Sequence, residues 1–192
     1  MKKFLIVLFF TLPFVSYGQY KYDFTHINNL MEVKGTEYVI ASIKHEDKIS
    51  KPNKESYLLF INTHTSEIKR VDFPDDTNIT DFEQVIIDSL DINSIIVLAQ
   101  TIDLDGKKGI GWDDPKQIII LSPNGEKYHQ LTPDSFFVQK FVVNNNTGTI
   151  IVTGSKDSNN NKKLDKSDES KILIYDLKTL QRIKEILNLN IN

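Results

Sequence analysis

The chain has 192 residues, no cysteine and a formal net charge of −3. A mildly acidic surface without a stripe of lysine and arginine argues against nucleic acid and anionic lipid as partners. The lack of cysteine excludes a disulfide framework and a lipidated cysteine, and no segment after the N-terminal one approaches the ~20 apolar residues of a membrane-spanning helix.

The first eighteen residues have the pattern of a secretory signal peptide. Two lysines precede an apolar run from Phe4 to Val15, and Ser16 and Gly18 supply the small residues before a cleavage point. We therefore expect cleavage after Gly18 and a secreted or periplasmic chain; a retained N-terminal anchor is the alternative. Residues 19–192 would form a single domain with its own core, and the loss of two lysines would change the formal charge from −3 to −5.

Short apolar runs rich in β-branched residues recur as three units of four, at about 24–73, 82–132 and 136–187. In the first unit the predicted strands are Ile27 to Val33, Tyr38 to Ile43, Leu58 to Ile61 and Glu67 to Phe73. In the second they are Phe82 to Leu90, Ile95 to Gln100, Ile118 to Leu121 and Glu126 to Leu131. In the third they are Phe136 to Val143, Ile150 to Ser155, Ile172 to Tyr175 and Arg182 to Leu187.

When the units are aligned, Ile95 corresponds to Ile150, 55 residues later, and Tyr38 corresponds to Ile95, at an offset of 57. The second and third strands of each unit are continuous apolar runs, which is typical of strands covered on both faces. Only Lys178 to Leu189 also has apolar residues at helical spacing. The repeat favours a strand there, because the same position is strand-like in the other two units.

Four antiparallel strands at a period of about 50 residues resemble a β-propeller blade. The order of apolar strand, Asp/Asn-rich loop, apolar strand and Asn124-Gly125 turn, leading to Gln130 to Pro133, is similar to secreted TolB-like propeller repeats. This resemblance covers nearly the whole mature chain and implies an all-β fold of three four-stranded antiparallel blade-like repeats, without a catalytic motif. Because propellers close with four to eight blades, we expect a homodimer that completes a six-bladed ring; three sheets packed in another way are the alternative.

Residues 157–168 have the ligand spacing of an EF-hand calcium loop. Side-chain oxygens fall at positions 1, 3, 5, 9 and 12, which are Asp157, Asn159, Asn161, Asp165 and Asp168. The Lys163 carbonyl would stand at position 7, and Leu164 at position 8 would anchor the loop in the blade core. Lys162 replaces the usual glycine at position 6, where a left-handed backbone costs about 1–2 kcal/mol. The alternative is a solvated turn whose side chains bond the local backbone.

A weaker version of this loop lies at the same place in the second unit. Asp103, Asp105 and Asp114 occupy positions 1, 3 and 12, but Lys107 and Gly111 supply no side-chain oxygen at positions 5 and 9. The loop of the first unit, residues 44–54, has no convincing ligand set. In a four-stranded meander all three loops lie at the end where the blades are connected, so the sequence predicts a calcium-stabilised loop face.

These patterns favour a non-enzymatic binding module for a protein or glycan ligand. The alternatives are an extracellular glycan-acting enzyme and a structural or assembly protein without an ion. No catalytic residue is predicted, because the four histidines are scattered and no nucleophile stands beside a base. We expect Trp112 to fold back over a blade end; an exposed platform that stacks on a sugar or a peptide is the alternative.

Overall fold

The fold is described on a computed structural model, for residues 24–46, 55–107 and 109–187. The predicted signal peptide, residues 1–18, and most of the first-unit loop lie outside these ranges. The described part of the chain contains no helix long and apolar enough to cross a membrane.

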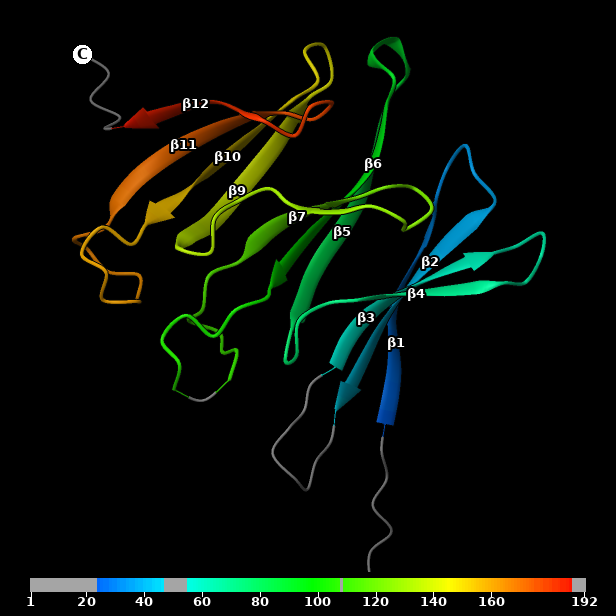
Figure 1. The fold of residues 1–192 in the computed structure, drawn as a ribbon, viewed down its shortest axis with the longest axis horizontal. Coiled ribbons are helices and arrows are strands. Elements are labelled where there is room, and N and C mark those ends of the chain that lie inside the picture. The colour runs from blue at the N-terminus through cyan, green and yellow to red at the C-terminus, as the bar shows by residue number, and fades with distance from the viewer. Residues whose placement is uncertain (1–23, 47–54, 108, 188–192) are drawn as a thin grey trace, which may run out of the picture.

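The described residues form twelve strands and one short 3-10 helix, Asp88–Leu90, as Figure 1 shows. The strands of blade 1 are β1 (Phe24–Glu32), β2 (Tyr38–Glu46), β3 (Glu55–Asn62) and β4 (Ile68–Asp72). Those of blade 2 are β5 (Asn78–Ile87), β6 (Ile92–Gln100), β7 (Gln117–Leu121) and β8 (Tyr128–Gln130). Those of blade 3 are β9 (Phe136–Asn144), β10 (Thr149–Lys156), β11 (Glu169–Asp176) and β12 (Arg182–Leu187).

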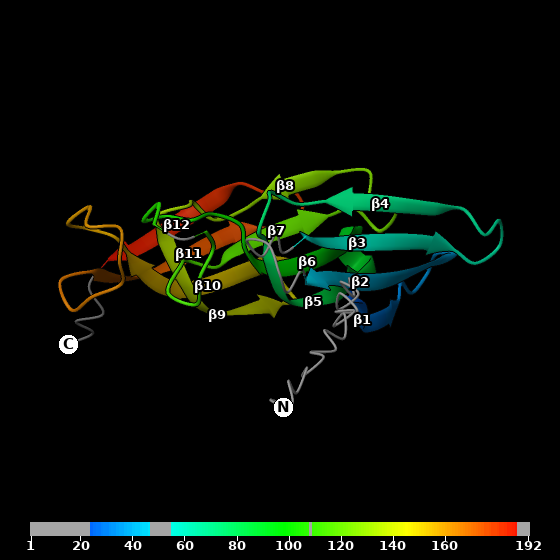
Figure 2. The same ribbon diagram turned by 90° about the horizontal axis from the view of Figure 1, so that it is seen from below.

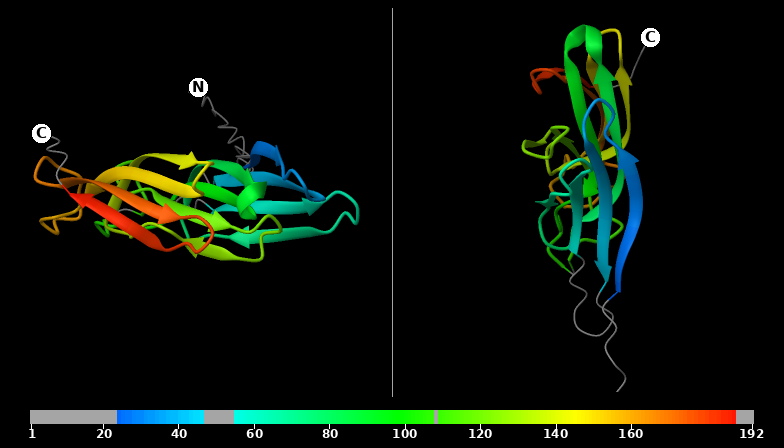
Figure 3. Two further views of the ribbon diagram at one scale, coloured as in Figure 1. Left: turned by 90° about the horizontal axis from the view of Figure 1, so that it is seen from above. Right: turned by 90° about the vertical axis from the view of Figure 1, so that its right-hand side faces the viewer.

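Each blade is a four-stranded antiparallel meander in which neighbouring strands follow one another in the chain. Strands β1, β5 and β9 lie along one edge of the row of blades, and β4, β8 and β12 lie along the other (Figure 2). The row is longer than it is thick, as the left panel of Figure 3 shows. The predicted all-β fold of three blade-like repeats is therefore confirmed.

The last predicted strand is a strand and not a helix. β12 pairs antiparallel with β11, and Ile186 lies opposite Ile172. A tight turn after Asp176 precedes it, because the Asp176 side chain accepts hydrogen bonds from the amides of Lys178 and Thr179. The repeat was thus a better guide than the helical spacing of the apolar residues.

The strand register corrects the alignment of the first two units by one residue. Val39 lies opposite Ile61, and Ile95 lies opposite Leu121. Val39 therefore corresponds to Ile95, at an offset of 56, and the predicted offset of 57 is wrong. The difference matters because a slip of one residue moves every side chain of a strand to the other face of its sheet.

Two apolar clusters join the blades. Between blades 1 and 2 the buried residues include Ile40, Leu58, Phe60, Ile95, Val97, Ile119 and Leu121. Between blades 2 and 3 they include Ile96, Ile118, Ile120, Ile150, Val152, Leu173 and Tyr175. All five residues of β7 are buried, since blade 2 is covered on both faces.

The outer faces of blades 1 and 3 are also apolar. On blade 1 the register places Leu30, Leu59 and Ile61 on the face that points away from blade 2, and Leu30 is 63% exposed. On blade 3 it places Val142 and Ile174 on the outer face, and Val142 is 59% exposed. The second and third strands of these two blades are thus covered by a neighbouring blade on one face only.

Candidate functional site: the aspartate-rich loop end

Two aspartate-rich loops project from the same end of the blades. One joins β6 to β7 and the other joins β10 to β11, and both lie on the side where β4 connects to β5 (Figure 1). The turns from β5 to β6 and from β9 to β10 lie on the opposite side. This arrangement confirms the prediction that the loops share one end with the connections between the blades.

The first half of the 157–168 loop is a series of turns held by its own side chains. The two carboxylate oxygens of Asp157 accept hydrogen bonds from the amides of Asn161 and Lys162, at 3.1 and 2.9 Å. The side-chain oxygens of Asn159 and Asn161 each accept one from the amide two residues on, at 2.9 Å. Such turns are the ordinary use of Asp and Asn in loops. Asp157 is the best buried of these ligand candidates, with 5% of its surface exposed.

The second half of the loop is closed by two aspartates. Asp168 accepts hydrogen bonds from the amides of Ser158 and Asp165, at 3.1 and 2.9 Å. The hydroxyl and amide of Ser167, at 2.6 and 2.7 Å, lower the pKa of Asp165 to about 2, and the side chain of Asn161 adds to this effect. The Asp165 carboxylate is therefore charged over nearly the whole accessible pH range.

The 103–114 loop is closed by its last aspartate in the same way as the 157–168 loop. Asp114, at position 12, accepts hydrogen bonds from the amides of Leu104 and Gly111, at 2.9 and 2.7 Å. These amides stand at positions 2 and 9, which are the positions that Asp168 bonds in its own loop. The two loops thus share the way their last aspartate closes them, but Asp103 accepts from the amides at positions 4 and 7 and Asp157 from those at positions 5 and 6.

The backbone at the predicted strain point is left-handed. Lys162 has a φ of 63°, and Asn160, two residues earlier, has a φ of 55°. Asparagine tolerates this conformation, whereas lysine in it costs about 1–2 kcal/mol relative to glycine. The hydrogen bond from the Lys162 amide to Asp157 compensates for part of that cost.

Three of the predicted calcium ligands meet, because the side-chain amides of Asn159 and Asn161 both donate to the Asp165 carboxylate. Among the described residues, no group of three or more Asp, Glu or His side chains is arranged to hold a metal ion. In both loops the carboxylates bond backbone amides, and Asp105 also forms an ion pair with Lys107 at 2.8 Å. Calcium at residues 157–168, and a weaker site at Asp103, Asp105 and Asp114, stay predictions.

A pocket of about 400 Å³, here called the loop-end pocket, lies between the two loops. Its lining includes Trp112, Asp113, Lys116, Phe137, Val138, Lys163 and Leu164. Trp112 is 92% exposed, so the expectation that it folds over a blade end is wrong. Leu164 is 50% exposed and lines the pocket, which corrects the expectation that it anchors the loop in the core.

Charges on the two loops act on each other. A hydrogen bond from the Lys107 side chain is the main cause of the lowered pKa of Asp105, and the positive charge of Lys163 on the other loop contributes to it. Lys163 and Asp113 both line the pocket, so it presents charges of both signs beside its apolar surface.

Two of the residues that make this site distinctive were missed by sequence reasoning. Phe137 and Leu164 were assigned to a strand and to a loop anchor, although both line the pocket. Gly154 offered a signal for Phe137, because a glycine inside a strand often marks a bulge, and the bulge found there changes the face on which the start of β9 lies. For Leu164 the sequence offered no signal, since its exposure depends on where the loop lies.

Comparison with known proteins identifies the fold alone. No protein-family model matches the chain, and no curated protein matches it. Acylaminoacyl peptidase from Pyrococcus horikoshii superposes with a TM-score of 0.51 at 9% sequence identity, over 88% of this chain and 26% of that one. The β-propeller domain of the Trilobed protease from Pyrococcus furiosus gives a TM-score of 0.49 at 9% identity, over 88% and 44% of the two chains. The chain thus spans less than half the length of either protein.

Proposed function

We propose that the protein is a secreted or periplasmic, non-enzymatic binding module of the TolB-like kind, whose ligand occupies the loop-end pocket. The observation that carries this proposal is the exposure of Trp112, 92%, on the rim of a pocket of about 400 Å³. Tryptophan is highly buried on average, and its large, rigid ring is enriched where proteins bind partners. A tryptophan held on a loop tip beside a pocket has the properties of a contact residue.

The lining of the pocket defines the kind of ligand. Trp112 and Leu164 supply most of the apolar surface, since Phe137 is buried, while Asp113, Lys116 and Lys163 supply hydrogen-bonding groups of both charges. A glycan presents apolar ring faces and hydroxyls together, and an extended protein segment presents side chains and amides together. Both combine a surface that stacks on an indole with groups that bond charged side chains.

Replacing Trp112 with alanine tests this function. We expect binding to the best ligand found on a panel of glycans and peptides to weaken at least about tenfold, which corresponds to about 1.4 kcal/mol. Tyr128→Ala is the control, because Tyr128 is an exposed aromatic residue, 42%, outside this pocket. Equal binding by the Trp112 variant and the original chain would show that the ligand lies elsewhere. Turnover of a panel glycan would instead support the enzyme hypothesis.

We also propose that calcium binds residues 157–168 and stiffens this side of the pocket. The proposal rests on the ligand spacing and on the burial of Asp157, and it requires Asp165 and Asp168 to exchange amide hydrogen bonds for the ion. That exchange, together with three nearby lysines, places the expected dissociation constant at about 10⁻⁴–10⁻³ M, as in extracellular modules. At about ten times that concentration the gain in stability is ~1.4 kcal/mol.

The expected result is a higher melting temperature in millimolar calcium than in chelator. Asp157→Ala should remove this difference, because Asp157 is the first ligand of the better loop. Asp103→Ala is the matched control in the other loop and should change the difference little. A melting temperature that does not respond to calcium in the original chain would contradict the calcium proposal and leave the Trp112 test unaffected.

A further inference from the structure

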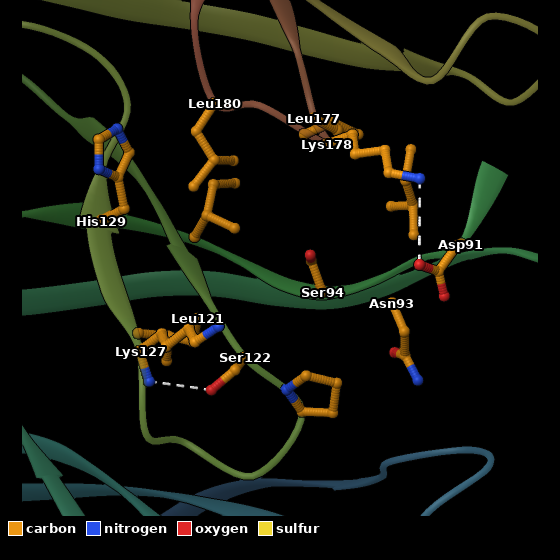
Figure 4. A pocket seen from close by; sticks show the side chains of 13 residues that line it. Asp91, Asn93, Ser94, Leu121, Ser122, Lys127, His129, Leu177, Lys178 and Leu180 are labelled. Atoms are coloured by element: carbon orange, nitrogen blue, oxygen red, sulfur yellow. Dashed lines mark hydrogen bonds and ion pairs between the residues drawn. The ribbon is translucent and has the colours of Figure 1, made fainter.

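A second pocket lies at the opposite end of the interface between blades 2 and 3, and we call it the turn-end pocket (Figure 4). Its volume of about 360 Å³ is within the range of about 300–1,000 Å³ that is usual for small-molecule sites. Its apolar lining consists of Ile92, Ile120, Leu121, Leu177 and Leu180. The Ser94 hydroxyl points into the space between them (Figure 4).

The charged groups of the turn-end pocket are mostly basic. Lys127 and Lys178 carry its two positive charges, Asp91 carries its one negative charge, and the imidazole of His129 also lines it. Lys178 is held in place, because its Nζ donates a hydrogen bond to the carbonyl of Leu90 at 3.1 Å and lies 3.9 Å from Asp91. A locally positive pocket on a chain of net charge −3 attracts anions selectively.

Leu180 enters this pocket from a strained turn. Its φ is 58°, a left-handed conformation that is uncommon for a large side chain. Ser66 in blade 1 and Gly125 in blade 2 occupy left-handed positions in the corresponding turns, with φ of 62° and 67°. The residue at the position of Leu180 in blade 1 is the smaller Ser66, and leucine is more strained than glycine in this backbone conformation. Such an outlier in a pocket points to a role for the side chain.

We propose that the turn-end pocket binds a small aliphatic carboxylate. The hydrocarbon tail of the ligand lies among Ile92, Leu121 and Leu180, and its carboxylate meets the ammonium groups of Lys127 and Lys178. Charge-assisted hydrogen bonds of this kind are about twice as strong as neutral ones. Because the pocket has an apolar floor and a basic rim, it should bind a ligand that has both an aliphatic tail and a carboxylate more tightly than a ligand that has only one of them.

A third pocket, of about 290 Å³ beside β12, does not support a comparable proposal. Its buried lysine, Lys171, bonds Glu185 at 2.7 Å, and Arg182 bonds the other oxygen of Glu185 at 3.0 Å. The positive charges there are matched by a carboxylate of the protein. In the turn-end pocket, by contrast, the Lys127 side chain extends toward the open space (Figure 4).

Titration of the mature chain with octanoate tests the proposal. Calorimetry should give saturable binding, and amide shifts in a ¹⁵N spectrum should concentrate in residues 91–94, 120–129 and 177–180. Two control ligands should each bind at least about tenfold more weakly than octanoate. Octanol has the hydrocarbon tail without the charge, and acetate has the charge without the tail. Equal binding of octanoate and octanol, or shifts spread over the outer faces of blades 1 and 3, would overturn the proposal.

Two variants separate binding from stability. Lys127→Met with Lys178→Met should weaken octanoate at least about tenfold, whereas Lys69→Met with Lys166→Met, which removes the same charge elsewhere, should not. Leu180→Gly removes the apolar contact and relieves the backbone strain. It should weaken octanoate while the melting temperature changes little, because lost packing and relieved strain oppose each other. An unchanged affinity in both pocket variants would show that these residues serve the fold only.

Discussion

Replacing Gly154 with alanine is expected to destabilise the protein by about 3 kcal/mol or more, at the upper end of what overpacking costs. A Cβ built on Gly154 would lie 2.3 Å from the carbonyl oxygen of Phe137 and 2.7 Å from the ring of Phe136. The oxygen belongs to the backbone of the neighbouring strand, so it can move only if β9 and β10 separate. Chemical denaturation followed by tryptophan fluorescence and circular dichroism measures the loss.

Thr153→Ala is the control for this experiment, because Thr153 is the preceding residue of β10 and lies on the outer face. It keeps the backbone contacts and should cost less than about 1 kcal/mol. If the Gly154 variant were as stable as the Thr153 variant, β9 and β10 would not be packed as closely as their register requires.

We also expect two copies of the chain to associate in solution at micromolar concentration and to complete a six-bladed ring. The outer faces of blades 1 and 3 are both apolar, and exposed apolar sheet faces mark interaction surfaces. The register places Lys140 and Lys184 on the outer face of blade 3, and it places Glu32 on that of blade 1, where Asp72 already forms an ion pair with Arg70. A two-fold axis would form the contact between blades 1 and 3 twice and leave no face uncovered.

Light scattering should therefore give twice the mass of one chain. Ile174→Glu places a charge on the outer face of blade 3 and should yield a monomer. Ile86→Glu, on the partly exposed end of β5, is the control that should stay dimeric. A monomer with a sharp, cooperative melt for the unaltered chain would contradict this assembly. The outer faces of one chain would then be stable without a partner.

The strands could be predicted because runs of β-branched residues are typical of buried strands. The three apolar runs that include Ile118 to Leu121 and its counterparts in the other units are all inner strands of their sheets. The sequence predicted less reliably which side chains of each strand point toward the neighbouring blade. Tyr38 and Ile95 both begin apolar runs, yet the register pairs Val39 with Ile61 and Ile95 with Leu121, one residue away from the sequence alignment. Apolar residues on both faces remove the alternation that would have fixed the register.

The candidate site could be predicted only where it depends on local sequence. Side chains that bond their own loop leave a local pattern, so the twelve-residue unit ending at Asp114 and Asp168 was visible in the sequence. The exposure of Trp112 and of Leu164 depends instead on how two loops from different blades lie beside each other. The sequence predicted a turn at Lys178 to Leu180, but only the structure shows that Leu180 has a φ of 58° and lines a pocket there.

The division of the core between the faces of blade 2 has a consequence for how the molecule comes apart. Among the described residues, the cluster around Phe60 contains no residue of blade 3, and the cluster around Ile150 contains none of blade 1. Stability is then a sum of nearest-neighbour terms, as in repeat proteins. In a chain that has no partner, either end blade can open while the other two stay packed, whereas β7 exchanges its amides only when both interfaces are lost. The middle blade is thus the slowest-exchanging part of the chain, and each end is a separate unit of local unfolding.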